Sequence, residues 1–236
     1  MLTDTNTKAI YRLSPVYRIV LIALGAASTA VGAFIAIPLP LSPVPIVLQN
    51  FFILLIALVL GPRMGAASVA LYLLLGALGL PVFAGGKGGF AHFFGPTGGY
   101  LAGFLLSAWI TGVLSAAGGR QRGGEPQSNS QRLPDGQPGE GLHQAPLRLS
   151  EGHPEGNAQK TKFRFQDAAA AAAGVLAVYL LGVPWLAYKL GFDWKKALIV
   201  GCLPFIPGDA LKAAAAIALA PEVRRLLLKE FHPDAG

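Results

Sequence analysis

Residues 204–212 read Pro-Phe-Ile-Pro-Gly-Asp-Ala-Leu-Lys and are followed by a run of mainly alanine over residues 213–220. The stretch places an acid, Asp209, and a base, Lys212, inside a segment that is otherwise apolar enough to lie in a bilayer. A charge at the centre of a membrane helix costs about 2.5 to 3.5 kcal/mol on insertion scales. At this spacing on a helix the two side chains share one face and partly neutralise each other, while two prolines and a glycine interrupt the backbone before them. The pair predicts a substrate or ion site facing the protein interior, and the alternative is an ion pair that only holds helices together.

The composition indicates a membrane protein. Hydrophobic residues make up 53% of the chain and charged residues only 13%, against about 25% charged in an ordinary soluble domain. The apolar residues form long blocks, which is the pattern of a chain that crosses the membrane several times. The single cysteine, Cys202, excludes an internal disulfide and a multi-cysteine metal site, and we predict no metal.

The blocks predict an all-α integral membrane protein with six transmembrane helices. We expect no enzymatic activity, because Asp209 and Lys212 are the only strong charges that we place inside the membrane. We expect a cytoplasmic segment over residues 1–18, four transmembrane helices within 19–117, two more within 167–220, and a polar cytoplasmic tail over 221–236. Residues 118–166 are rich in Gly, Gln, Pro, Ser, Glu and Arg and predict a hydrophilic, disordered cytoplasmic loop. The predicted spans are 19–37, 45–60, 64–80, 98–117, 167–190 and 195–220.

The basic residues set the topology. Fourteen of the 19 lysines and arginines fall on the side of both termini and four on the other side, while Lys212 lies within the membrane. The positive-inside rule therefore places both termini in the cytoplasm. The net charge of +7 follows from this topology, and nucleic acid is not needed to explain it. Asp209 and Lys212 are the strong charges that we place inside the membrane.

Two connections predict a cavity roofed by loops. Residues 38–45 contain four prolines and predict an extended segment that covers an apolar cavity. Residues 81–99 hold too many glycines for a helix and too many aromatic residues for a linker, which suits an irregular cavity-lining segment. The G-x-G-x-x-A pattern at 86–91 is not a dinucleotide site, because neither a strand before it nor a βαβ unit around it is expected. His92 is a lone histidine, and such a residue is more often packed or at the surface than a ligand or a catalytic base.

Polar side chains near these connections are candidate ligand contacts. The amides of Gln49 and Asn50, near the start of the second span, could bind a polar ligand or a neighbouring helix. Tyr100 could point into the site or lie in the interfacial aromatic belt.

Four motifs carry a resemblance to a known family. They are Val-Pro-Ile-Val-Leu-Gln at 44–49, Gly-Leu-Pro-Val-Phe-Ala-Gly-Gly at 79–86, Gly-Pro-Thr-Gly-Gly-Tyr at 95–100, and the opening stretch at 204–212. In this order they resemble the BioY family, whose members are biotin-binding S components of energy-coupling-factor (ECF) transporters. The resemblance covers residues 18–220 apart from the long loop.

The resemblance implies biotin uptake across the plasma membrane, with a transmembrane coupling subunit and two ATPase subunits as partners. ATP would be bound by those partners, and the chain itself needs no cofactor. The family's D-x-x-K motif, which lines its biotin pocket, maps onto Asp209 and Lys212. We add four predicted substrate-binding residues from the other segments: Gln49, Tyr100, Phe90 and Gly86. The A-x-x-x-A patch on the first helix, which contacts the coupling subunit in the family, matches Ala23 and Ala27.

The chemistry suits biotin, because a carboxylate such as Asp209 can accept from the ureido N–H groups and Lys212 can donate to a carbonyl or carboxylate oxygen. Which end of biotin meets Lys212 is left open. Two features depart from the family: Val47 stands where Thr is common, and the 118–166 loop is much longer. The alternatives are a capture protein for another vitamin, a membrane enzyme, which would need a nucleophile and a base within its spans, or a purely structural membrane protein.

Overall fold

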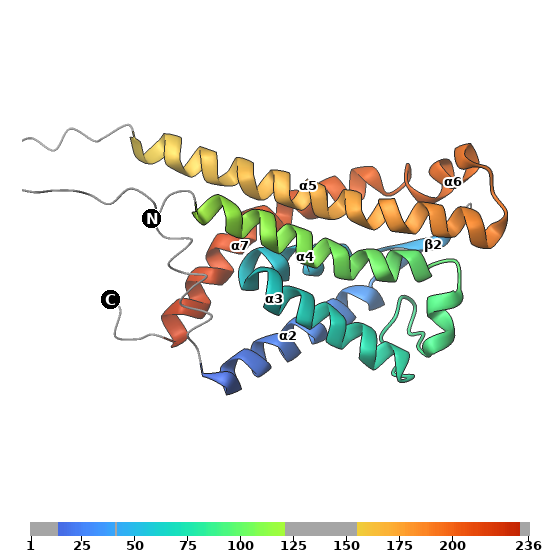
Figure 1. Cartoon of the computed structure of the whole chain (residues 1–236), viewed down its shortest axis with the longest axis horizontal. Coiled ribbons are helices and arrows are strands. Elements are labelled where there is room, and N and C mark those ends of the chain that lie inside the picture. The colour runs from blue at the N-terminus through green and yellow to red at the C-terminus, as the bar shows by residue number, and fades with distance from the viewer. Residues whose placement is uncertain (1–13, 41, 121–154, 232–236) are drawn as a thin grey trace, which may run out of the picture.

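The computed structural model describes residues 14–40, 42–120 and 155–231. Its helices run alongside one another along the long axis of the molecule (Figure 1). Within the described residues, four helices are long and apolar enough to cross a membrane, and a fifth span results if the bent pair α6–α7, with an angle of 47°, counts as one. The elements in chain order are α2 (Pro15–Phe34), β1 (Ala36–Leu39), β2 (Ser42–Val47), α3 (Gln49–Ala77), the 3₁₀ helix η1 (Phe90–Phe94), α4 (Gly98–Arg120), α5 (Glu155–Leu190), α6 (Trp194–Gly201) and α7 (Ile206–Phe231).

Helix α3 folds back on itself at the predicted turn. Gly61 has φ 79° and ψ −176°, a conformation that suits glycine, and Pro62 follows it. A Cβ on Gly65 would lie only 3.0 Å from the Cα of Ala57, whereas a straight helix would separate these positions by roughly 12 Å. The two arms of α3 are therefore antiparallel, and they correspond to the second and third predicted spans.

The proline-rich connection is extended, as predicted. Strands β1 and β2 pair in antiparallel register, with Ala36 opposite Val47 and Ile37 opposite Ile46. Because residues 36–39 belong to this hairpin, α2 ends at Phe34 instead of continuing to residue 37. The helix also begins earlier than expected, at Pro15, since proline is well tolerated in the first helical turn.

The structure corrects the boundaries of the hydrophilic loop. Helix α4 continues to Arg120 and α5 begins at Glu155, so the parts of the predicted 118–166 loop on either side of residues 121–154 are helical. Adding a residue to an existing helix gains a hydrogen bond without a new nucleation cost, which allows membrane helices to extend past their apolar spans. Residues 121–154 of the loop predicted to be disordered, residues 1–13 of the predicted 1–18 segment and residues 232–236 of the predicted 221–236 tail lie outside the described residues.

The C-terminal segment also differs from the prediction. The break falls at residues 202–205, and Pro207 and Gly208 lie in the first turn of α7 instead of interrupting the backbone before it. Proline is tolerated there because its missing N–H would have no partner within the helix. Helix α7 then continues to Phe231, well into the predicted tail. Asp209 consequently lies in the first turn, where the helix dipole favours an anion.

A second pair of charged side chains is buried far from Asp209. Asp167 is 2% exposed and Arg224 is 5% exposed, although the sequence placed both outside the interior of the membrane. Asp167 accepts a hydrogen bond from Ser115 on α4 at 2.7 Å, and Arg224 donates to the backbone oxygen of Leu58 on α3. Asp209 and Lys212 are therefore not the only strong charges inside the helix bundle.

Candidate ligand-binding cavity

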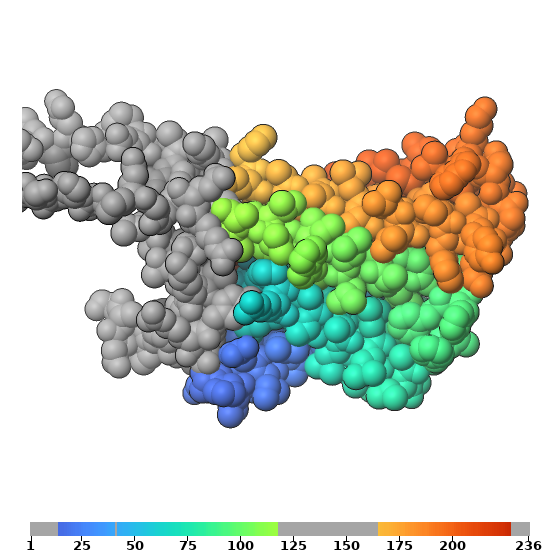
Figure 2. All heavy atoms as spheres, viewed as in Figure 1, coloured from blue at the N-terminus to red at the C-terminus, as the bar shows by residue number. Residues whose placement is uncertain are grey.

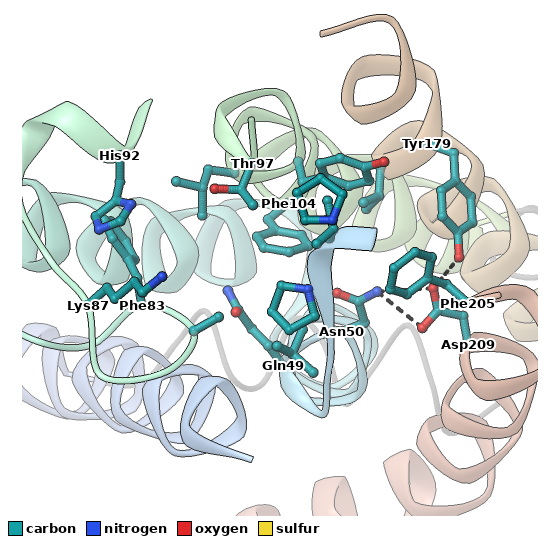
Figure 3. A pocket seen from close by; sticks show the side chains of 18 of the residues that line it. Gln49, Asn50, Phe83, Lys87, His92, Thr97, Phe104, Tyr179, Phe205 and Asp209 are labelled. Atoms are coloured by element: carbon teal, nitrogen blue, oxygen red, sulfur yellow. Dashed lines mark hydrogen bonds between the residues drawn. The ribbon is translucent and has the colours of Figure 1, made fainter. Parts of the chain in front are cut away.

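One cavity of about 130 Å³ lies between the β1–β2 hairpin, the 81–99 connection and four helices, α3, α4, α5 and α7. Figure 3 shows Lys87 and His92 at one end, Asp209 and Tyr179 at the other, and Phe104, Thr97 and Gln49 between them. Most of its surface is apolar, which is typical of small-molecule sites with a few placed polar groups. Its lining residues are Pro43, Val44, Pro45, Val47, Gln49, Asn50, Phe83, Ala84, Lys87, His92, Thr97, Tyr100, Leu101, Phe104, Val178, Tyr179, Phe205, Asp209 and Lys212.

Asp209 is held by donors from three helices. Lys212 on the same helix contacts its Oδ1 at 2.9 Å, and Tyr179 on α5 donates to its Oδ2 at 2.5 Å. The amide nitrogen of Asn50 on α3 lies 3.2 Å from both carboxylate oxygens. The Asp209 side chain is only 3% exposed and that of Lys212 only 11%. Such a buried ion pair is tolerable because its remaining lone pairs are also satisfied.

Two side-chain atoms of α3 at the cavity are buried without a hydrogen-bond partner in the described part of the chain. They are the amide nitrogen of Gln49 and the amide oxygen of Asn50. The hydroxyl of Tyr72, which is 1% exposed, shares this property. A buried polar atom without a partner costs about 1 to 3 kcal/mol. Gln49 also interacts with Tyr72, so the Asn50 oxygen is the clearer candidate for a bond with a ligand or a water in the cavity.

The structure brings four of the predicted substrate-binding residues to the cavity. Asp209, Lys212, Gln49 and Tyr100 line it. The hydroxyl of Tyr100 donates to the backbone oxygen of Gly201 at 2.7 Å, so it satisfies a carbonyl at the end of α6 that has no partner within the helix. The ring of Tyr100 is therefore a wall of the cavity, fixed by this bond.

Phe90 and Gly86 are placed differently. The Phe90 side chain is 63% exposed and is not among the lining residues. Gly86, with φ 70°, lies between Ala84 and Lys87, which do line the cavity. Their roles in substrate binding stay predictions.

Sequence reasoning missed several lining residues. Tyr179 and Phe205 lie in apolar runs where an aromatic residue suggests only packing. Lys87 and His92 lie in the glycine-rich connection, and the packing expected of His92 is present as an edge-to-face contact with Phe83. Asn50 could have been given more weight, since a polar amide within an apolar span is costly unless it is used.

Helix α2 presents two different faces. Its buried residues, which include Gly25, Ala26 and Gly32, pack against α3. Ala23 and Ala27 lie on the exposed side. Figure 2 shows α2 along one edge of the molecule, with α3 beside it. The exposed face is therefore open to contact from outside the chain, as the predicted partner patch requires.

The sequence itself identifies the family. A model of the BioY family matches residues 5–229. The chain belongs to the BioY family. It is 37% identical over 204 residues to the probable biotin transporter BioY of Pyrococcus horikoshii, a match that covers 86% of this chain and 94% of the relative. It is 36% identical over 196 residues to the biotin transporter BioY of Thermotoga maritima, which covers 83% of this chain and 89% of the relative.

A solved structure supports the same assignment. The fold is similar, with a TM-score of 0.67 and 26% sequence identity, to the S-component for biotin from an ECF-type ABC transporter, and the match covers 90% of this chain and 95% of that chain. The resemblance inferred from the four motifs is therefore confirmed. Like its BioY relatives, which are transporters, this chain is a membrane protein, and its long apolar helices agree with this.

Proposed function

We propose that this BioY chain captures biotin and takes part in its uptake as the substrate-specific subunit of an ATP-driven ECF transporter. The observation that carries this proposal is a mostly apolar cavity with the Asp209–Lys212 pair at one end, in a chain whose relatives are named biotin transporters. Biotin has a ureido ring with two N–H donors and one carbonyl, an apolar thioether ring and chain, and a carboxylate. This sequence of polar, apolar and anionic groups suits the cavity.

The charges at the two ends of the cavity favour one orientation of biotin. Figure 3 places Lys87 and His92 at the end away from Asp209 and Tyr179. A ligand carboxylate near Asp209 would meet an existing anion, whereas at Lys87 it would meet an exposed cation. The ureido ring therefore binds beside Asp209 and Lys212, and the carboxylate binds at Lys87. Gln49 and Tyr100 complete the site between these ends.

The membrane arrangement has six spans with both termini in the cytoplasm. Helices α2, α4 and α5 are one span each. The two arms of α3 provide two more spans, and the bent pair α6–α7 provides the sixth. The basic residues favour this orientation through the positive-inside rule. The β1–β2 hairpin and the 81–99 connection, which line the cavity, then form its roof on the extracellular side.

Transport requires partners that supply energy. The exposed small residues Ala23 and Ala27 on α2 allow a partner helix to approach closely, and they form the contact with a transmembrane coupling subunit. Two ATPase subunits bind ATP on the cytoplasmic side. This chain supplies specificity and performs no chemical conversion.

Calorimetric titration of the purified protein with biotin tests the function directly. We expect saturable binding much tighter than micromolar, and mass spectrometry of gently purified protein should identify biotin as the bound ligand. A panel of other water-soluble vitamins provides the matched comparison. Absence of biotin binding tighter than micromolar would sink the proposal, and tighter binding of another vitamin would reassign the substrate.

A further inference from the structure

The amide of Asn50 has one possible orientation at the cavity. Its nitrogen lies 3.2 Å from each oxygen of Asp209, and an ionised carboxylate can only accept hydrogen bonds. Exchanging the amide oxygen and nitrogen would place an acceptor against two acceptors, so the nitrogen must face Asp209. The amide oxygen then points away from Asp209 and toward the middle of the cavity, as Figure 3 shows.

That oxygen is the free acceptor of the site. It is buried and has no hydrogen-bond partner in the described ranges, and Asn50 lines the cavity. A buried carbonyl that stays unsatisfied costs about 1 to 3 kcal/mol. A ligand N–H placed against it would remove this cost, which makes the oxygen a strong acceptor for a ligand that brings a donor.

The Asp209 carboxylate, by contrast, is already occupied. Three donors surround it: Lys212 bonds to Oδ1, Tyr179 bonds to Oδ2, and the Asn50 amide nitrogen lies equally far from both oxygens and shares its hydrogen bond between them. Two carboxylate oxygens offer about four lone-pair positions. A ligand N–H at Asp209 would compete with these three donors for the remaining acceptor capacity, whereas at the Asn50 oxygen it would meet no competing donor from the described part of the chain.

We propose, on the basis that biotin is the ligand, that the amide oxygen of Asn50 accepts a hydrogen bond from one ureido N–H of biotin. Asp209 acts through Asn50 as a positioning residue: it holds the amide nitrogen and thereby aims the oxygen into the cavity. Lys212 pairs with Asp209 at 2.9 Å and has two further N–H donors for the ureido carbonyl. The urea group of biotin is neutral. It would meet a neutral acceptor, the Asn50 oxygen, next to the Lys212 ammonium group that binds its carbonyl.

The test compares biotin with two analogues, in each of which one ureido N–H is replaced by a ring oxygen to give a cyclic carbamate. Affinities are measured by calorimetry on the full chain. We expect the wild-type protein to bind one of the two carbamates at least tenfold more weakly than biotin. In Asn50→Leu, biotin binding should weaken at least tenfold, and the discrimination against that carbamate should disappear.

Tyr179→Phe is the matched control, because it removes a different donor to Asp209 and leaves the Asn50 oxygen in place. It should keep the wild-type ratio between biotin and the carbamate. The inference is overturned if Asn50→Leu keeps that ratio, or if the wild-type protein binds biotin and both carbamates equally. Should Asn50→Leu not fold, Asn50→Ala answers the same question. A wild-type protein that binds no biotin refutes the proposed function instead, and the inference with it.

Discussion

Substitution of Arg224 by Met tests the buried charges at the end of the bundle away from the cavity. The backbone oxygen of Leu58 would normally accept the N–H of residue 62, but that residue is proline and has no N–H. Arg224 donates to this oxygen in its place. Its positive charge also partly offsets the negative charge of the buried Asp167, whose hydrogen-bond partner is Ser115. One side chain therefore satisfies the carbonyl freed by the α3 turn and lessens the cost of a buried acid.

The expected loss in Arg224→Met is about 1 to 3 kcal/mol of unfolding free energy, the usual cost of leaving a buried acceptor without its hydrogen bond. Met fills similar space, so the loss comes mainly from the Leu58 carbonyl, not from a cavity. At roughly 2 to 4 °C per kcal/mol for a chain of this size, the melting temperature should fall by roughly 2 to 12 °C. Biotin affinity should change little, because Arg224 lies roughly 22 Å from Asp209 along α7 at about 1.5 Å per residue.

Thermal unfolding of the detergent-purified protein, followed by circular dichroism, measures this loss. Arg225→Met is the matched control, since Arg225 is 82% exposed and lies 4.0 Å from an exposed Glu222. Exposed pairs of this kind contribute little. Asp167→Asn combined with Arg224→Met should restore part of the lost stability, because the uncompensated charge is then gone. Equal melting temperatures for Arg224→Met and Arg225→Met would refute the reasoning.

Three further outcomes are expected. Asp209→Asn should weaken biotin binding at least tenfold, about 1.4 kcal/mol, as measured by calorimetry, whereas the exposed Asp193→Asn should leave it unchanged; equal affinities would contradict the role of Asp209. Lys87→Met should weaken the binding of biotin more than that of its uncharged carboxamide, and an equal loss for both would argue against a carboxylate contact. Ala23→Trp or Ala27→Trp should leave biotin binding unchanged but abolish uptake of labelled biotin by cells that express the coupling module. Undiminished uptake would exclude this face of α2 as the contact with the coupling subunit.

Much of the fold could be predicted because the bilayer constrains it strongly. Apolar blocks separated by proline and glycine give the helices, and the predicted spans 45–60 and 64–80 meet where α3 turns at Gly61 and Pro62. The helix ends were less predictable. An α-helix that leaves the membrane meets no penalty for continuing in water, so composition did not reveal that α5 begins at Glu155.

The site was predictable only in part, because sequence patterns show local pairs but not contacts between distant segments. Asp209 and Lys212 stand out because charges are rare in apolar segments, and their spacing on one helix makes the pair visible in the sequence. The partners of Asp209 are a different matter, since Asn50 and Tyr179 come from distant parts of the chain. No local pattern encodes such contacts, and a tyrosine in an apolar helix is usually a packing residue.

The two buried charge clusters explain how α7 holds the cavity in shape. Near its start, Asp209 is bound to Asn50 on α3 and Tyr179 on α5, and roughly four turns later Arg224 donates to the Leu58 oxygen on α3. Between these points α7 has small residues, of which Ala216 and Ala220 are fully buried against α3. Because small residues allow close helix contact and the polar contacts fix the register at both ends, α7 cannot slide or rotate without exposing a charge to hydrocarbon. The position of the Asp209–Lys212 pair is thus set by the whole length of α7, which prepares the site for a ligand before the ligand arrives.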